Sequence, residues 1–360
     1  MGIIRGGNAE YDESKPSLEE LAPRIEEVVA NGLKSDSTSL KLSGKYYSTD
    51  EITLLARSNQ VSQVRALDLG DNQIGDEALK ILSESNQLLN LEELKLGINF
   101  ITDNGMKEWA DSSSATLKNI KMLVLSDNKL TDDSLVELIK SPNFPTLESL
   151  DIGWMEAGNK TAEAIGASDT LLHLKKLELE RSYVDAEGIQ ALIDGEVAGN
   201  LEELNLIANK LGDDGAKVIA RASNLKSLKV LNLSQNMIGD EGAKAIGTST
   251  HLTGLTHLYM GRNGFSPEGA KVIHQTKTLT KLKALVLQEA RIEELGLVAR
   301  SVVAEDRHNA MPRLAPRGER PDFHEVFIAR QRDAGQTARD TPAFLGGGQD
   351  PRGSGGLARR

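Results

Sequence analysis

Leucines recur along most of the chain in a pattern that combines two periods. Each unit has the form Leu-x-x-Leu-x-Leu-x-x-Asn-x-Ile/Leu, as in residues 91–101, 201–211 and 228–238. Leucines that alternate with other residues predict a short strand with one face turned inward. Apolar residues at helical spacing follow, such as Ala243 and Ile246, and predict a helix. Each unit is therefore expected to form a strand, a turn and a helix.

The units repeat in one register. Their strand leucines lie 27 residues apart, except for one step of 29, and are Leu67, Leu94, Leu123, Leu150, Leu177, Leu204, Leu231, Leu258 and Leu285. A fixed period of this length indicates a solenoid in which each coil buries its apolar face against the next. The number of these leucines predicts an α/β fold of about nine to ten units. Because a parallel strand is narrower than the helix opposite it, the stack of units is expected to curve. This fold is a right-handed horseshoe with a parallel sheet on its concave face and helices on its convex face.

Three further columns accompany the leucines. An asparagine after the strand is expected to bond the backbone of adjacent coils, and this ladder is Asn72, Asn99, Asn128, Asn209, Asn236 and Asn263. Aspartates at helix starts are expected to accept bonds from the first free helical amides; they are Asp76, Asp103, Asp132, Asp213 and Asp240. Small residues are expected where a helix passes close to its strand, at Ala78, Gly105, Ser134, Thr161, Gly188, Gly215, Gly242, Gly269 and Gly296.

The 27-residue unit, with Gly-Asp-Glu-Gly-Ala at residues 239–243, resembles the leucine-rich repeat of the ribonuclease-inhibitor-like subfamily. That subfamily also includes Ran GTPase-activating proteins and many bacterial repeat proteins. The resemblance covers residues 38–298 and implies the horseshoe fold. It says little about function, because the matching residues are the ones that build the coil.

The ends of the chain differ from the array. Residues 1–37 are expected to form an N-terminal segment with a capping helix, and residues 38–299 the solenoid. Residues 300–360 hold 11 Arg, no Lys and 8 Asp or Glu, which gives this segment a net charge of +3. Since the whole chain has a net charge of −11, residues 1–299 have a net charge of −14. This Arg-, Gly- and Pro-rich tail is expected to be disordered, since its composition cannot bury a core.

Several kinds of chemistry are disfavoured. The chain has no cysteine, which excludes disulfides, thiolate zinc sites and a cysteine nucleophile. It has no Gly-x-x-x-x-Gly-Lys-Ser/Thr phosphate loop, and His324-Glu325 lacks the second histidine of a helical zinc site. We therefore predict no catalytic residue, no metal and no cofactor. The acidic array argues against nucleic acid, and no apolar stretch has the length of a membrane span.

One region departs from the repeat. Met155 and Ser182 replace the asparagine in two consecutive units, beside aromatic and arginine residues of the kind that dominate protein interfaces. Either this region anchors a protein ligand of basic character, or it is ordinary repeat degeneration with Trp154 tucked against a neighbouring coil. The candidate partner-binding residues are Trp154, Glu178, Glu180, Arg181, Tyr183, Asn205, Tyr259 and Arg262.

The expected function is that of a non-catalytic scaffold that binds a protein on its concave face. We expect a cytoplasmic monomer, or a bacterial protein that is exported into a host cell. The alternative is a regulator of a small GTPase, because the resemblance to Ran GTPase-activating proteins implies that the same architecture supports that role.

Overall fold

A computed structural model describes residues 16–287 of the chain, and within them ten three-residue strands form one parallel sheet. Consecutive strands are joined by one α-helix each, and a further helix precedes the first strand. The elements are α1 Leu18–Gly32, β1 Ser39–Lys41, α2 Thr49–Arg57, the short 3-10 helix η1 Asn59–Val61, β2 Ala66–Asp68, α3 Asp76–Ser83, β3 Glu93–Lys95, α4 Asp103–Asp111, β4 Met122–Val124, α5 Asp132–Lys140, β5 Ser149–Asp151, α6 Asn159–Gly166, β6 Lys176–Glu178, α7 Ala186–Asp194, the 3-10 helix η2 Val197–Asn200, β7 Glu203–Asn205, α8 Gly212–Arg221, β8 Val230–Asn232, α9 Asp240–Gly247, β9 His257–Tyr259, α10 Pro267–His274 and β10 Ala284–Val286.

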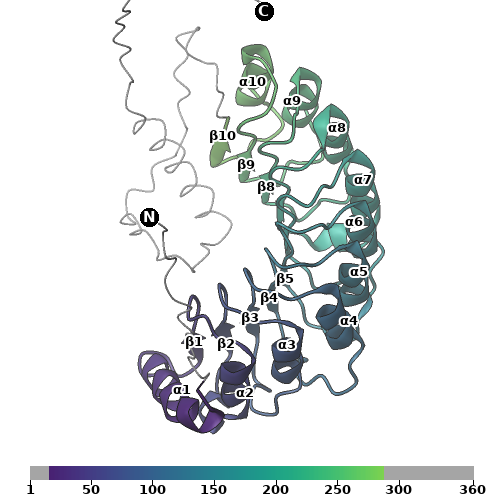
Figure 1. The fold of residues 1–360 in the computed structure, drawn as a ribbon. Helices are drawn as coiled ribbons and strands as arrows, with labels where there is room; N and C mark the ends of the chain where they lie inside the picture. Colours follow the sequence, from purple (N-terminus) through teal and green to yellow (C-terminus); the bar gives the residue numbers. More distant parts are fainter. Residues whose placement is uncertain (1–15, 288–360) are drawn as a thin grey trace, which may run out of the picture. The chain divides into compact units, whose positions relative to one another are not determined.

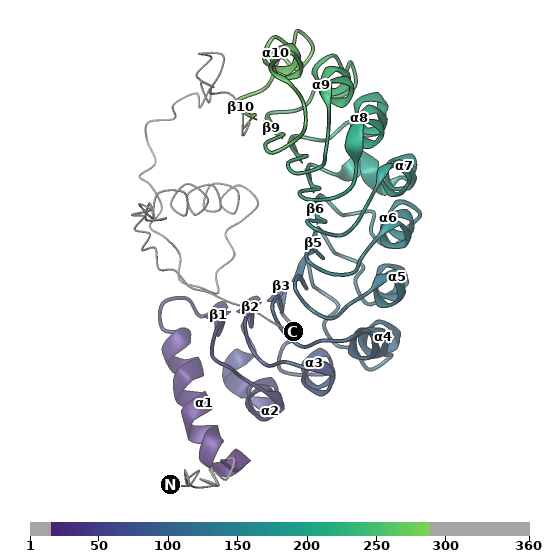
Figure 2. The ribbon, with the colours of Figure 1, turned by 45° about the horizontal axis from the view of Figure 1, so that its top comes forward.

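The strands follow one another in chain order from β1 to β10, and each strand from β2 to β9 is paired in parallel with the strand before and the strand after it in this order. Strand leucines pair with strand leucines, as Leu177 does with Leu204. The strands line the inner side of an open curve and the helices its outer side (Figure 1, Figure 2). Strands lie about 4.8 Å apart, whereas helices need about 10 Å, so stacking coils of this kind must curve toward the sheet. The expected α/β solenoid is confirmed.

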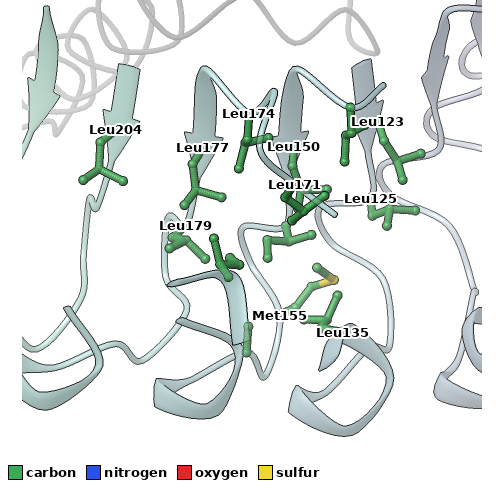
Figure 3. Close-up of a cluster of buried hydrophobic side chains, with 14 of the residues drawn as sticks. Leu123, Leu125, Leu135, Leu150, Met155, Leu171, Leu174, Leu177, Leu179 and Leu204 are labelled. Atoms are coloured by element: carbon green, nitrogen blue, oxygen red, sulfur yellow. The ribbon is translucent and has the colours of Figure 1, made fainter. Parts of the chain in front are cut away.

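The core is one continuous stack of aliphatic layers between the sheet and the helices. Leu150, Leu177 and Leu204 are fully buried, and the helix leucine Leu135 packs into the same cluster (Figure 3). Burying one such side chain contributes about 1.5–3 kcal/mol. Because every coil supplies the same set of leucines, stability accumulates coil by coil rather than from one central core.

The asparagines join each coil to the one before it. The amide of Asn209 donates to the carbonyl of Leu179 at 2.8 Å, and its oxygen accepts from the backbone N–H groups of Ser182 and Val184 at 3.2 and 2.9 Å. These backbone groups have left the sheet and are buried, so each would be costly without a partner. The Asn209 side chain therefore links the loops of two neighbouring coils by hydrogen bonds.

The aspartates at helix starts also act between coils, which corrects the expectation that each serves the helix it begins. Asp213 stands second in α8, but its carboxylate accepts from the backbone N–H groups of Gly239 and Gly242, at 2.7 and 2.8 Å, at the start of α9. Asp132 accepts in the same way from Gly158 and Thr161 at the start of α6. Each carboxylate thus caps the helix of the following coil.

This bridge also explains the column of small residues. A Cβ atom on Gly242 would lie 2.7 Å from the Asp213 carboxylate and 2.9 Å from the Cβ of Ala216 in α8. The close approach is therefore between neighbouring helices, and not between a helix and its own strand as the sequence was expected to require. Gly296, the last member of the column, lies outside the described residues.

The first coil is covered by α1. Ser17 caps this helix in a reciprocal capping box with Glu20, and Leu21, Ile25 and Val29 are its buried face. The helix lies against β1 and α2. The apolar end of the sheet is thereby shielded from solvent, as a terminal coil requires. The predicted tail, residues 300–360, lies outside the described residues.

Candidate functional site

The predicted partner-binding residues divide between two neighbouring surfaces. Glu178, Asn205 and Tyr259 lie on strands β6, β7 and β9, at the position after the strand leucine, and point away from the core onto the concave sheet face. Trp154 and Arg181, with Tyr183 and Arg262, lie beyond the strands in the loops that lead to the helices.

The centre of the sheet face is acidic. Glu178 accepts a hydrogen bond from the Asn205 side-chain amide at 2.7 Å and lies 3.4 Å from the Lys176 ammonium group. Burial raises the pKa of Glu178 to about 7, and the Asp151 carboxylate on the neighbouring strand β5 adds to the rise. Glu180, two residues further along, is also buried. We call Asp151, Glu178 and Glu180 the acidic cluster.

Lys176 lies beside two carboxylates of the sheet face, the first of which is Glu178 on its own strand. Its ammonium group also lies 3.5 Å from the Glu203 carboxylate on β7. Lys176 therefore pairs with one carboxylate on each of two neighbouring strands in a partly buried environment, where opposite charges interact more strongly than in bulk water.

A left-handed residue lies three positions past the end of each strand from β2 to β9, where the chain turns toward the helix. Trp154 has a φ of 59° and Arg181 a φ of 53°, and residues in the same position of the other coils from Asp71 to Arg262 are also left-handed. The backbone N–H of Trp154 donates to the backbone carbonyl of Glu180 at 2.6 Å, which continues the parallel hydrogen-bond ladder past the strands. The Trp154 side chain is thus held at the margin of the sheet by a backbone conformation that non-glycine residues rarely adopt.

Trp154 and Arg181 stack on one another. The Arg181 guanidinium carbon lies 4.1 Å from the centre of the indole ring, a cation–π contact between two consecutive coils. Both residues, with Tyr183, line an open hollow of about 510 Å³ whose wall also includes Lys129, Met155 and Glu156. Met155, which replaces a ladder asparagine, is itself buried among the core leucines (Figure 3).

The same kind of pair occurs twice more along this margin. The Lys129 ammonium group lies 5.4 Å from the Phe100 ring, and that of Lys210 lies 5.0 Å from the Tyr183 ring. We call the positions four and six residues after each strand leucine the strand-end edge. Of the eight large hydrophobic residues that are exposed in the described part of the chain, five lie on this edge: Tyr46, Ile98, Phe100, Tyr183 and Met237.

The structure therefore brings some predicted residues together and separates others. Trp154, Arg181 and Tyr183 share the hollow, and Glu178 and Asn205 share a hydrogen bond. Tyr259 stacks on His257, with ring centres 6.4 Å apart, at a distance of three coils from Glu178. Arg262 is exposed on the strand-end edge of that same later coil.

Phe100, Lys129 and Lys210 were not among the predicted site residues. Each of them, with Tyr183, lies six residues after a strand leucine, and each cation follows its aromatic partner by one coil. An aromatic residue and a cation in the same column of adjacent units is a signal that aligned repeats contain. The regular columns of the repeat are the buried ones, whereas this exposed column changes residue type from coil to coil, so its pairs were not predicted.

Neither a cluster of metal-ligating side chains nor a membrane-spanning helix occurs in residues 16–287. Within that range, His, Asp and Glu side chains form no group of three or more that could hold a metal ion. No helix in the same range combines the length and the apolar character that crossing a membrane requires.

Comparison with known proteins gives one match to a family model. The model, described as a leucine-rich repeat, matches residues 64–83, 200–220, 224–247 and 251–273. No curated protein matches this chain.

Among solved structures, a crystal structure of a TDR receptor is 16% identical over 73% of this chain and 45% of that chain, with a TM-score of 0.37. The present chain thus spans less than half of that receptor chain. A crystal structure of an internalin from Listeria monocytogenes is 20% identical over 75% of this chain and 94% of that one, with a TM-score of 0.33. Each segment matched by the family model contains one strand and all or most of the helix after it. The chain contains leucine-rich repeats.

Proposed function

We propose that this chain is a non-catalytic scaffold whose concave sheet face binds a protein partner through a basic side chain of that partner. Leucine-rich repeats generally serve as protein–protein interaction scaffolds. The 27-residue spacing and the helix in every coil support the finer assignment to the ribonuclease-inhibitor-like type. The absence of cysteine from the sequence favours action in a reducing cytoplasm, either the cell's own or that of a host.

The observation that carries this proposal is the acidic cluster. Glu178 is held where burial and the Asp151 carboxylate both disfavour its charge, so that its pKa rises to about 7. An arginine or lysine placed beside it would favour the charged form and would gain a charge-assisted hydrogen bond. The position is central in the sheet, with five strands before β6 and four after it, and side chains near the centre of an interface contribute most to binding.

The other predicted residues surround this centre. Asn205 orients Glu178 through its 2.7 Å hydrogen bond, while Trp154, Arg181 and Tyr183 stand at the adjoining margin of the sheet. We propose that Tyr259 and Arg262 extend the contact toward the later coils. Electrostatic complementarity of this kind sets partner choice and association rate more than it sets total affinity.

The test is capture by the full-length chain from an extract of the cells in which the protein occurs, followed by affinity measurement on the captured partner. Glu178→Gln is expected to weaken binding about tenfold or more, because it removes the charge at the centre of the contact. Glu163→Gln, an exposed change of equal charge on the convex helix α6, is the matched control and is expected to have no effect. Equal affinity of all three proteins would contradict the proposal.

GTPase regulation remains a separate activity that the same protein can be tested for. Hydrolysis of GTP by a panel of small GTPases, with and without the full-length chain, measures it directly. Acceleration of any of them would favour the alternative function over a purely passive scaffold.

A further inference from the structure

Between Phe100 and Lys210 the strand-end edge carries three cations together with the carboxylates of Asp127 and Glu156, whereas the sheet face beside it is acidic at its centre. Lys129, Arg181 and Lys210 stand over the rings of Phe100, Trp154 and Tyr183. None of these three cations forms an ion pair with a carboxylate within residues 16–287. By contrast, Lys121, Lys175 and Lys229 are each paired with a glutamate.

A cation that lies over a ring is ordered before any ligand arrives. The ring face holds the Arg181 guanidinium group 4.1 Å away, while the N–H groups at the rim of that group can still donate to a ligand. Carboxylates are the natural acceptors for this rim, since arginine binds them through two parallel hydrogen bonds. Glu156 is the only carboxylate on the wall of the hollow between Lys129, Trp154 and Tyr183.

The edge also offers apolar surface at matching intervals. Phe100 and Tyr183 are more than half exposed, at 51% and 58%, and Ile98 is exposed in the same coil as Phe100. Exposed apolar residues that gather in one row, rather than scatter, mark interaction surfaces. Large side chains of this kind in left-handed positions also cost the chain about 1–3 kcal/mol each, which a glycine would avoid.

We propose that the strand-end edge from Phe100 to Lys210 binds an extended segment of a partner protein in which carboxylates stand next to large apolar side chains. Lys129 and Lys210 are three coils apart, about 15 Å at the spacing of the sheet, which an extended segment spans with about five residues. The segment places carboxylates at Lys129, Arg181 and Lys210, and its apolar side chains enter the hollow and cover Phe100 and Tyr183. This inference goes beyond the proposed function, because it assigns a different surface and a ligand of opposite charge.

The test needs no knowledge of the natural partner. A display library of random 12-residue peptides is selected on the full-length chain, and the selected peptides are measured against two triple variants. The first is Lys129→Gln/Arg181→Gln/Lys210→Gln. The second, Lys140→Gln/Lys160→Gln/Lys244→Gln, removes the same charge from exposed positions on the convex helices α5, α6 and α9 and is the matched control.

The selected peptides are expected to be rich in Asp or Glu beside Trp, Phe or Leu. Their affinity should fall at least tenfold with the edge variant and stay unchanged with the control variant. Selection of basic peptides, equal loss with both variants, or no selection at all would overturn the proposal.

A single substitution guards against a folding defect in the triple variant. Glu156→Gln removes the one carboxylate on the wall of the hollow and is expected to strengthen binding of the acidic peptides by roughly two- to fivefold. Binding can be followed through Trp154 emission in a Trp109→Phe background, because the chain has two tryptophans and Trp109 is buried against Phe144. Weaker binding of the Glu156→Gln protein, or an unchanged Trp154 signal, would contradict the placement of the ligand.

Discussion

Asn209→Ala is expected to destabilise the solenoid more than Asn236→Ala, although the two asparagines occupy the same position in neighbouring coils and both are buried. The Asn209 oxygen accepts from the backbone N–H groups of Ser182 and Val184, and its amide donates to three carbonyls. The Asn236 amide donates to two carbonyls, but its buried oxygen has no hydrogen-bond partner. The Asn236 oxygen lacks a donor because a left-handed Gly212 in the loop of the preceding coil redirects the chain into α8.

The magnitudes follow from the groups that each substitution leaves without a partner. Each buried amide that loses its acceptor costs about 1–3 kcal/mol, so Asn209→Ala is expected to lower the free energy of unfolding by about 2–5 kcal/mol. One of the two carbonyls bound by Asn236, that of Leu206, keeps the donor that Asn209 supplies. Asn236→Ala is therefore expected to cost about 1–2 kcal/mol.

Urea unfolding followed by circular dichroism measures the difference. With a slope of roughly 3 kcal/mol per M, the midpoint of Asn209→Ala should fall about 0.7 M below that of the Asn236 variant. Hydrogen exchange of the Ser182 and Val184 amides should accelerate in the first variant only. Equal midpoints, or faster exchange of these two amides in both variants, would refute the account of the ladder.

Three further outcomes are expected. Gly242→Ala, whose Cβ would lie 2.7 Å from the Asp213 carboxylate, should lower the melting temperature, whereas Gly75→Ala, with nothing within 4 Å, should not. Asp213→Ala should cost about 2–3 kcal/mol in urea unfolding by removing two hydrogen bonds to the next helix, and its exposed neighbour Asp214→Ala less than about 0.5 kcal/mol. Glu178 has a pKa of about 7 in the folded chain, above its ordinary 4.5, so stability should fall as pH rises from about 4.5 to 7. The total loss is at most about 3 kcal/mol in the free energy of unfolding, since the side chain is 15% exposed. Glu178→Gln should remove this pH dependence. If the variant and the wild type differ equally in stability between pH 5 and pH 8, the assignment is wrong.

The buried part of this fold could be predicted from the sequence because burial leaves a periodic trace. Leu177 and Leu179 alternate with polar residues, and the 27-residue period places Leu177 beside Leu204 in the sheet. A one-residue error in register would have turned every leucine to the wrong face, so the pattern admits a single alignment.

The bonds between coils could not be predicted in the same way. The spacing of Asp213 and Gly239 repeats in several coils, but a periodic sequence does not say whether a carboxylate serves its own helix or the next. That choice depends on the distance between neighbouring helices, which the small residue at Gly242 makes short. Tertiary geometry therefore decided what the pattern left open.

The candidate site was predictable in its residue types and not in its layout. Trp154 and Arg181 departed visibly from the repeat, and their cation–π contact follows from positions one coil apart. The sequence did not separate these residues from Glu178, because the turn that carries them off the sheet depends on left-handed residues of ordinary types. The residues that were predicted to form one patch therefore lie on two surfaces: Glu178 on the acidic sheet face, and Trp154 and Arg181 on the strand-end edge.

The most direct measurement of the central claim is photo-crosslinking to the captured partner from defined positions. A benzoylphenylalanine replaces Glu203 on β7, next to the acidic cluster on the sheet face, or Glu163 on the convex helix α6. Crosslinking from position 203 and not from position 163 is the predicted result. Crosslinking from position 163 alone would place the partner on the helices and contradict binding to the sheet.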